Sequence, residues 1–410
     1  MIIEAPSKIT HAPVTHKFVR TRMIWQFYIL AGLCSFVASS LGPMMPFLKG
    51  ELNFNYTVMA CHFSAFALGV LISGAFGERV MASLGRKKAM WAGLAGVALG
   101  VSTLLLGSIA LVTVSGIFLA GMCASVFGQV IDTVIAERLG EQRTIAITET
   151  NIVTSICATI APAAIGMFVT AGMNWRAPLA MLIVFLGIAY MVFGGNEIPE
   201  PTESEKAETH GGSGKLARAY WAYWCVILLG CASEWSIVFW SPDFLQNAAR
   251  MPKPQAAAAV SAFFVAMMAG RILGSALARK MNIRVLLPGA SALSLLGFLI
   301  FWLAPNSTIN VIGLFVAGLG VANMYPLTLS AALGVVPNQV GLAASRMNMA
   351  TGSAGLCAPL VLGGIADRVG IHQAFAVLAV MLTIAVAAVF WANKLAIKEH
   401  SRLLDLNRAA

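Results

Sequence analysis

Charged side chains are scarce in this 410-residue chain: Asp, Glu, Lys and Arg make up 11% of it, and hydrophobic residues make up 59%. A soluble protein carries charge on about a quarter of its residues, because its surface must be solvated. The shortage of charge therefore excludes an ordinary soluble domain and indicates a chain surrounded by lipid.

Enzyme motifs are missing as well. The sequence contains no GxxxxGK(S/T) phosphate-binding loop, no HExxH and no GxSxG. Its seven cysteines lie in apolar runs without metal or disulfide spacing, so we expect them to behave as small hydrophobic residues. Residues 1–22 lack the apolar core and cleavage site of a removable signal peptide. We predict a non-enzymatic protein without cofactor or metal.

Long apolar runs are what the sequence has instead. A helix needs about 20 apolar residues to cross a bilayer. Such runs occur at 22–46, 57–78, 88–108, 110–137, 147–170, 176–195, 217–246, 256–278, 285–303, 309–334, 341–364 and 373–393. The sequence thus predicts twelve membrane-spanning helices.

Lys and Arg are unevenly distributed among the loops between these runs. Twenty fall on the side that holds both tails and the loops at 79–88 and 279–284, and five fall on the other side. Because cytoplasmic loops carry the excess of Lys and Arg, both termini are predicted to be cytoplasmic. The net charge of +10 is dispersed over short loops, which argues against a nucleic-acid partner.

One long polar stretch interrupts the apolar pattern. Asn196 to Lys215 reads NEIPEPTESEKAETHGGSGK, and its Pro, Glu, Gly and Ser content is typical of a flexible linker. The predicted organisation is an N-terminal cytoplasmic tail at 1–21, a six-helix bundle at 22–195, a cytoplasmic linker at 196–216, a second six-helix bundle at 217–393 and a cytoplasmic tail at 394–410.

The two halves repeat one another with an offset of 197 residues. SAFALGVLISGAFGERVMASLGRKK, from Ser64, aligns with SAFFVAMMAGRILGSALARKMNIR, from Ser261, so that Gly77 falls on Gly274. The same offset aligns Gly116 with Gly313 and Ala161-Pro162 with Ala358-Pro359. Segments that share one offset indicate a duplicated half, which here means two homologous membrane bundles.

With these features the chain resembles the major facilitator superfamily of secondary transporters. The family's loop between helices two and three carries a glycine, an aspartate, then a glycine with basic residues; Gly85-Arg86-Lys87-Lys88 matches its end, while Glu78 and Ala82 replace the first glycine and the aspartate. The resemblance implies an all-α membrane protein of twelve transmembrane helices in two six-helix bundles. It also implies that Arg86 and Glu78 take part in gating.

Glu234 is the most informative ionisable residue within the predicted spans. It lies near the middle of the seventh apolar run, in WCVILLGCASEWSIVFW. Ionisable groups at membrane depth are rare and point to function, and burial favours the protonated form of a carboxylate. We predict that Glu234 binds substrate or carries a coupled proton, with a structural hydrogen bond as the alternative. Trp235 beside it is a candidate for stacking on substrate.

Arg271, within the eighth run, keeps its charge and needs an anionic partner. It resembles the arginine of monocarboxylate transporters that meets the substrate carboxylate, and a structural ion pair is the alternative. Polar residues in other runs are further candidates for substrate contact. They are Gln129, Asn151, Asn323 and Tyr325.

Two further charges predict a cytoplasmic gate. Asp132 and Arg346 lie at similar depths in the fourth and eleventh runs, whose cytoplasmic ends approach one another in this family when the gate closes. We predict an ion pair that forms in one state only, with Asp132 also a candidate for proton coupling.

Three other ionisable residues within the apolar runs are expected to have no role in transport. Glu149 is expected to favour the start of its helix, Asp243 to be exposed, and His62 to be structural.

These observations predict a secondary active transporter that moves a small organic solute, preferentially an anion, by alternating access with proton coupling. Sodium is the alternative coupling ion. We expect a monomer in a cell membrane, specifically a bacterial inner membrane. One alternative is a proton-coupled exporter of lipophilic or cationic drugs, although Ala161 precedes Pro162 where such antiporters carry glycine, and Ile117 replaces their arginine. Another is a membrane sensor that binds ligand without transport.

Overall fold

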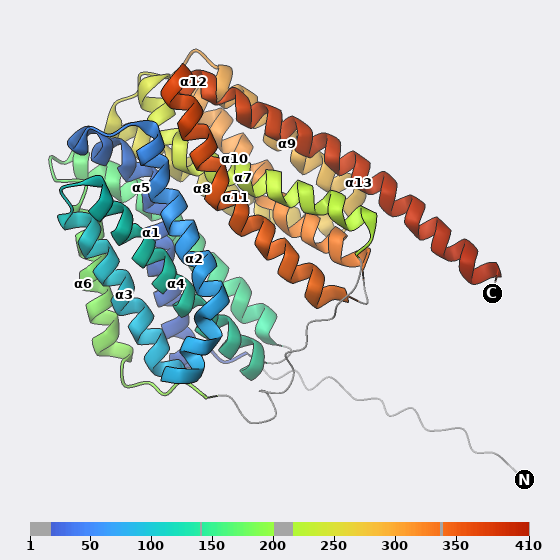
Figure 1. Ribbon diagram of the computed structural model, residues 1–410, viewed down its shortest axis with the longest axis horizontal. Helices are drawn as coiled ribbons and strands as arrows, with labels where there is room; N and C mark the ends of the chain where they lie inside the picture. The colour runs from blue at the N-terminus through green and yellow to red at the C-terminus, as the bar shows by residue number, and fades with distance from the viewer. Residues whose placement is uncertain (1–17, 140–141, 201–215, 337–338, 410) are drawn as a thin grey trace, which may run out of the picture.

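The computed structural model describes residues 18–139, 142–200, 216–336 and 339–409, and these are helices joined by short connections (Figure 1). The first six are α1 (Arg22–Leu52), α2 (Tyr56–Leu84), α3 (Arg86–Leu106), α4 (Ala110–Arg138), α5 (Arg143–Thr170) and α6 (Ala177–Phe193). The others are α7 (Arg218–Asn247), α8 (Lys253–Ala278), α9 (Ile283–Leu303), α10 (Ser307–Gly334), α11 (Val340–Val369), α12 (Ile371–Ala374) and α13 (Ala376–Ala409). Most of the predicted linker and N-terminal tail lies outside the described residues.

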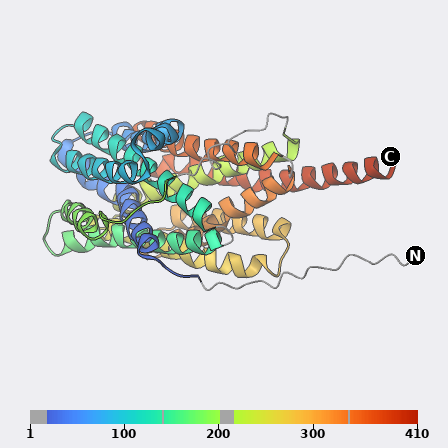
Figure 2. The ribbon, with the colours of Figure 1, turned by 90° about the horizontal axis from the view of Figure 1, so that it is seen from below.

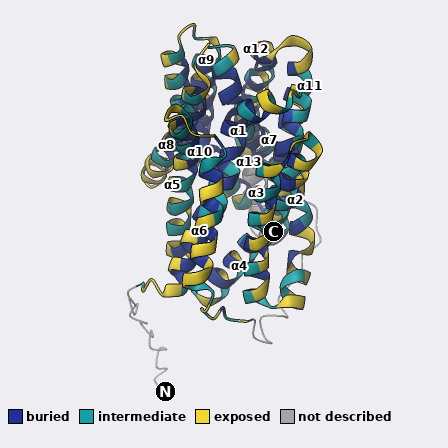
Figure 3. Cartoon of the chain, turned by 90° about the vertical axis from the view of Figure 1, so that its left-hand side faces the viewer, coloured by how far each residue is buried: buried dark blue, intermediate teal, exposed yellow. Residues whose placement is uncertain are grey.

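Eleven spans within the described ranges are long and apolar enough to cross a membrane. The sixth predicted span is a shorter apolar helix, α6, of 17 residues. The twelfth is preceded by the short helix α12, and the two together form the span Ile371–Lys398. Exposed residues lie mainly on the outward faces of the helices (Figure 3), and they include large apolar ones such as Leu106 and Met191. Apolar side chains on outward faces are what contact with lipid requires.

The repeat seen in the sequence extends to the positions where helices begin. The starts of α2 and α8 are 197 residues apart (253 − 56 = 197), and the same separation holds for α3 and α9, α4 and α10, and α5 and α11. Four successive helices therefore share one register. We call residues 22–193 the first half and residues 218–409 the second half.

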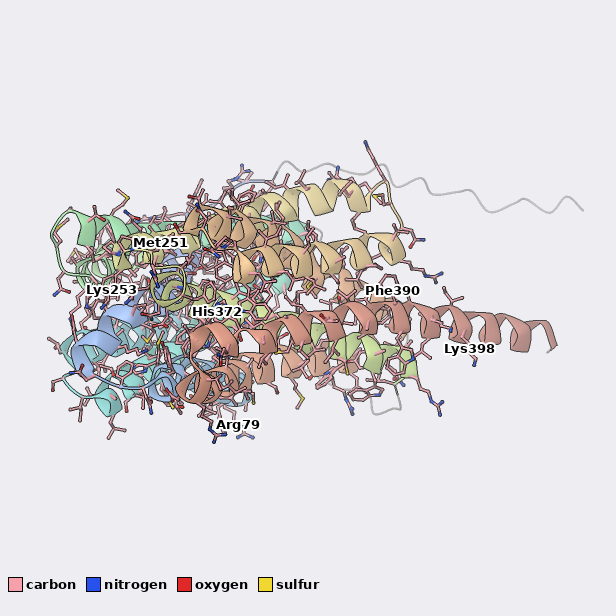
Figure 4. All side chains as sticks on the ribbon, turned by 90° about the horizontal axis from the view of Figure 1, so that it is seen from above. Arg79, Met251, Lys253, His372, Phe390 and Lys398 are labelled. Atoms are coloured by element: carbon pink, nitrogen blue, oxygen red, sulfur yellow. The ribbon has the colours of Figure 1, made fainter. Side chains whose placement is uncertain are left out.

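Helices pack mainly against others of the same half, such as α3 on α4 and α9 on α10. The halves meet where α5 packs on α8 and α2 packs on α11 (Figures 1 and 2). Close approaches between the halves place Gly166 against Ala258 and Gly363 against Ala60. These residues lie toward the end of the molecule at which α2 and α8 begin, which we call the closed end. Figure 4 shows Met251 and Lys253 at this end and Lys398 at the opposite one.

Polar contacts join the halves at the closed end. The carboxylate of Asp367 on α11 accepts hydrogen bonds from the backbone amides of Tyr56 (2.7 Å) and Thr57 (2.9 Å), the first residues of α2. Asp243 on α7 is 1% exposed and lies 3.7 Å from the ammonium of Lys49 on α1. The prediction that Asp243 is exposed was wrong, because packing between the halves covers the outer end of α7.

Candidate functional site

A cavity of about 750 Å³ is lined by residues of the second half together with Asn151 of the first half. Its walls come from α5, α7, α8, α10 and α11, and it extends past the end of α8 to Met281 and Ile283. A second cavity of about 220 Å³ shares Asn151, Glu234 and Arg271 with the first and extends toward α1. The two cavities form one region that reaches from the middle of the helices toward the end opposite the closed end.

Glu234 and Arg271 line both cavities, so the two charges singled out in the sequence share one site. Arg271 is exposed to the cavity, and its Nη1 donates to Ser155 Oγ on α5 at 3.2 Å, from one half to the other. Glu234 is partly buried. Within the described ranges neither residue forms an ion pair. A guanidinium and a carboxylate therefore face the same space without forming an ion pair with each other.

Four of the other predicted contact residues also line the larger cavity: Asn151, Trp235, Asn323 and Tyr325. The ring of Trp235 packs against Phe63 of the first half, with 5.4 Å between centroids. Some lining residues were missed from the sequence, namely Ser275, Ser330 and Thr351. Helical spacing was the available signal, because Ser275 lies one turn after Arg271.

Gln129 lies elsewhere. Its Nε2 donates to the carbonyl oxygen of Ser73 (3.2 Å) and to the hydroxyls of Ser73 and Ser125 (3.2 and 3.3 Å). It belongs to the packing of α2 on α4 and is not among the residues that line the cavity around Glu234. The prediction that Gln129 contacts substrate therefore has no support from this geometry.

Asp132 and Arg346, the predicted gate pair, form no ion pair with each other in this conformation. Asp132 is exposed, while the guanidinium of Arg346 lies over the ring of Trp221, 5.3 Å from its centroid. Trp224 also donates from Nε1 to the backbone carbonyl of Arg346 at 2.9 Å. Their pairing in another conformation stays a prediction.

Two other ionisable residues have local partners. Glu149 is the seventh residue of α5, and its carboxylate accepts from Arg20 Nε (2.9 Å) and Tyr28 OH (3.0 Å). It thus ties α5 to α1, which corrects the prediction that it serves the start of its own helix. His62 is fully buried, with Nε2 2.9 Å from Thr113 Oγ1, as a structural histidine would be.

Arg86 is buried among acidic partners at the end of the molecule where α2 ends. It is 4% exposed, and its Nη2 donates to Glu137 on α4 at 2.8 Å. Its backbone amide, at the start of α3, donates to Glu200 Oε1 at 2.8 Å. Glu200 and Glu137 thus supply acidic partners for a loop that has Ala82 in place of an aspartate. Glu78, the other predicted gating residue, is exposed.

We expect Arg86→Gln to destabilise the protein, because the change leaves the Glu137 carboxylate without its charged partner at a largely buried position. Losing one member of such a pair costs about 3 kcal/mol. The measurement is the midpoint of thermal unfolding in detergent, which should fall by several degrees. Lys87→Ala is the control, because it breaks the neighbouring Lys87–Glu197 pair, whose carboxylate is 90% exposed, and should change the midpoint little. Equal midpoints for the two variants would contradict the assignment.

In the part of the chain that the structure describes, eleven helices are long and apolar enough to cross a membrane, and a cavity lined by charged, polar and apolar side chains lies among them, which together define an integral membrane protein of the transporter class. A family model described as Major Facilitator Superfamily matches residues 27–313 and 251–405, and the chain belongs to that superfamily. Membership in this superfamily indicates a transporter and not an enzyme.

Two curated membrane proteins are similar in sequence to parts of this chain. The chain is 30% identical to an uncharacterized MFS-type transporter of Yersinia pestis over 158 residues (38% of this chain, 41% of that protein). It is 28% identical to the membrane protein MosC of Rhizobium meliloti over 166 residues (40% of each). The matches thus span about two fifths of these curated relatives.

Solved structures with the same fold include a bacterial homologue of the human lysosomal transporter Spinster, in an inward-facing and occupied conformation. Its TM-score is 0.73 at 13% identity, with 93% of this chain and 98% of that chain covered. The nucleoside transporter NupG has a TM-score of 0.71 at 14% identity, with 92% and 99% covered. At such identities the likeness concerns the fold alone.

Proposed function

We propose that this protein is a proton-coupled secondary transporter of small organic anions that works by alternating access. The observation that carries the proposal is that Glu234 and Arg271 line the same two cavities and form no ion pair with each other. The proposed site also includes Asn151, Trp235 and Tyr325.

Arg271 supports the preference for an anion. A guanidinium always carries its charge and matches a carboxylate with two parallel hydrogen bonds. In the conformation described, Arg271 donates to the hydroxyl of Ser155, lines both cavities and forms no ion pair, although it interacts electrostatically with Glu234. A carboxylate in the cavity would neutralise a charge that is costly to leave unpaired at membrane depth.

Glu234 supports coupling to protons. Its carboxylate lies halfway along α7, in a wall otherwise rich in apolar side chains such as Met267 and Val321. An apolar environment favours the neutral carboxylic acid. Protonation of Glu234 removes a negative charge that would repel an anion beside Arg271, so binding of the proton and binding of the anion would each favour the other. This arrangement supports the proposal that anion and proton move together.

The closed end supports alternating access. Contacts between the halves lie on one side of the cavity, and the cavity extends to Met281 and Ile283 on the other. With both termini cytoplasmic, as the Lys and Arg bias predicts, this conformation would face inward. We propose a monomer in the inner membrane, with two six-helix bundles at 22–195 and 217–393 that rock about the site.

A thermal-shift screen of the detergent-purified protein tests the proposal. The panel holds small carboxylates, sugars, nucleosides and lipophilic cations, at mildly acidic and at neutral pH. A ligand that binds the folded state raises its apparent stability. We expect carboxylates to stabilise the protein, more strongly at acidic pH, and Glu234→Gln to remove the pH dependence. Stabilisation by lipophilic cations alone would overturn the proposal in favour of drug export.

Transport itself is measured in proteoliposomes. A carboxylate from the panel should accumulate when the outside is made acidic, and accumulation should not respond to a sodium gradient. Binding without flux would instead identify a sensor.

A further inference from the structure

Asn323 holds the backbone next to Arg271. Its Nδ2 donates to the carbonyl oxygen of Gly270 at 2.8 Å, and this carbonyl belongs to the peptide unit that joins Gly270 to Arg271. A side chain at Gly274, one turn further along α8, would overlap Asn323 Oδ1. The amide of Asn323 thus lies against one turn of α8, from Gly270 to Gly274, and its Nδ2 also donates to the carbonyl oxygen of Leu319 at 3.5 Å.

The first half contains a similar arrangement, in which the held turn lies at the equivalent position but the carboxamide comes from Gln129, three residues beyond Val126, the position equivalent to Asn323. Gln129 on α4 donates from Nε2 to the carbonyl oxygen of Ser73 on α2, and a side chain at Gly77 would overlap Gln129 Oε1. Ser73 and Gly77 are related to Gly270 and Gly274 by the offset of 197 residues. Both halves therefore use a carboxamide to hold one turn of a neighbouring helix, and both require glycine for the close approach.

The residue after the held carbonyl differs between the halves. In the second half it is Arg271, which lines the cavity, whereas the equivalent position in the first half is Gly74. Gln129 consequently holds a turn that carries no charged side chain. Asn323 holds the turn from which the only arginine among the cavity-lining residues projects.

We propose that Asn323 is a positioning residue for Arg271 and not itself a substrate ligand. The hydrogen bond to the Gly270 carbonyl fixes the peptide unit before Arg271, and with it the direction in which the guanidinium enters the cavity. That this guanidinium receives a substrate carboxylate rests on the proposed function; the role of Asn323 toward Arg271 does not.

The test measures Arg271 directly. Phenylglyoxal modifies accessible guanidinium groups, and its rate of reaction at each arginine can be followed in peptic peptides by mass spectrometry. Asn323→Ala should raise the rate at Arg271 about fivefold, the ratio that loss of one ordinary hydrogen bond gives. Gln129→Ala, the matched control, should leave the rate at Arg271 unchanged, and Arg346 should react equally in all variants.

Benzoate serves as the anion probe in a second measurement. Protection of Arg271 by benzoate should need a higher concentration in Asn323→Ala and the wild-type concentration in Gln129→Ala. Asn323→Leu, which keeps the size of the side chain without its donor, should behave like Asn323→Ala and replaces it if that variant does not fold. Absence of benzoate protection in the wild type would count against the proposed function while leaving the rate comparison intact.

Three results would overturn the assignment. An unchanged rate at Arg271 in both Asn323 variants would mean that the hydrogen bond does not position the guanidinium. An equal rise in Gln129→Ala would mean that any loosening of the helix packing exposes Arg271. Weaker benzoate protection with an unchanged rate would make Asn323 a direct ligand.

Discussion

Arg271→Ala is expected to abolish binding of carboxylates at concentrations that saturate the wild type. The change removes the cationic group that lines both cavities, and a carboxylate would then enter without a counter-charge. Hydrogen bonds to a charged group contribute about 3 kcal/mol, so affinity should fall roughly a hundredfold. The measurement is equilibrium binding of the carboxylate that gives the largest thermal shift.

Arg271→Lys separates charge from geometry. Lysine keeps the positive charge but cannot offer two parallel hydrogen bonds, so its affinity should lie between those of the wild type and the alanine variant. Arg279→Ala is the control, because Arg279 lies just beyond the end of the same helix and is not among the cavity-lining residues. Wild-type affinity in Arg271→Ala would refute the anion site.

The main parts of the site could be predicted because charge within an apolar run is visible in the sequence. Glu234 and Arg271 were singled out on that ground, with a family resemblance in support of Arg271, and both line the cavity. Asn151, Asn323 and Tyr325 followed from polarity in the same way. Hydropathy also gave the spans, since a helix that crosses a bilayer must be long and apolar.

The features that could not be predicted depend on which face of a helix a residue occupies. Gln129 is as polar as Asn151, but it points to α2 because Gly77 leaves room for it there. Asp243 is buried because Lys49 lies across the junction of the halves. The partner of Arg86 at its backbone amide, Glu200, is 114 residues away in the chain. Periodicity within one helix contains none of this information.

Asp367→Asn is expected to loosen the closed end. The Asp367 carboxylate, on the second half, accepts from the first two backbone amides of α2, on the first half, so it stabilises the contact both by hydrogen bonds and by its charge at a helix N-terminus. The proposed alternating access requires this end to open, so these bonds would break in each transport cycle. The amide variant loses the charge and one acceptor oxygen.

Loss of about 2 kcal/mol would raise the population of molecules with this end open roughly thirtyfold. Hydrogen–deuterium exchange followed by mass spectrometry measures the change. Exchange should rise at both sides of the contact, in the first three turns of α2 and in residues 352–367 of α11. Uptake driven by a pH gradient should change with it, because the balance between the two access states is altered.

Glu51→Gln is the matched control for this prediction. Glu51 is also a carboxylate near the closed end, and it accepts from Trp175 Nε1 at 2.8 Å and pairs with Arg176, but all three residues belong to the first half. Breaking these bonds should raise exchange locally and leave α11 unaffected. If Asp367→Asn behaves in the same way, with no change at α11, the bond across the halves is not what keeps this end closed, and apolar contacts such as that of Gly363 on Ala60 must do so.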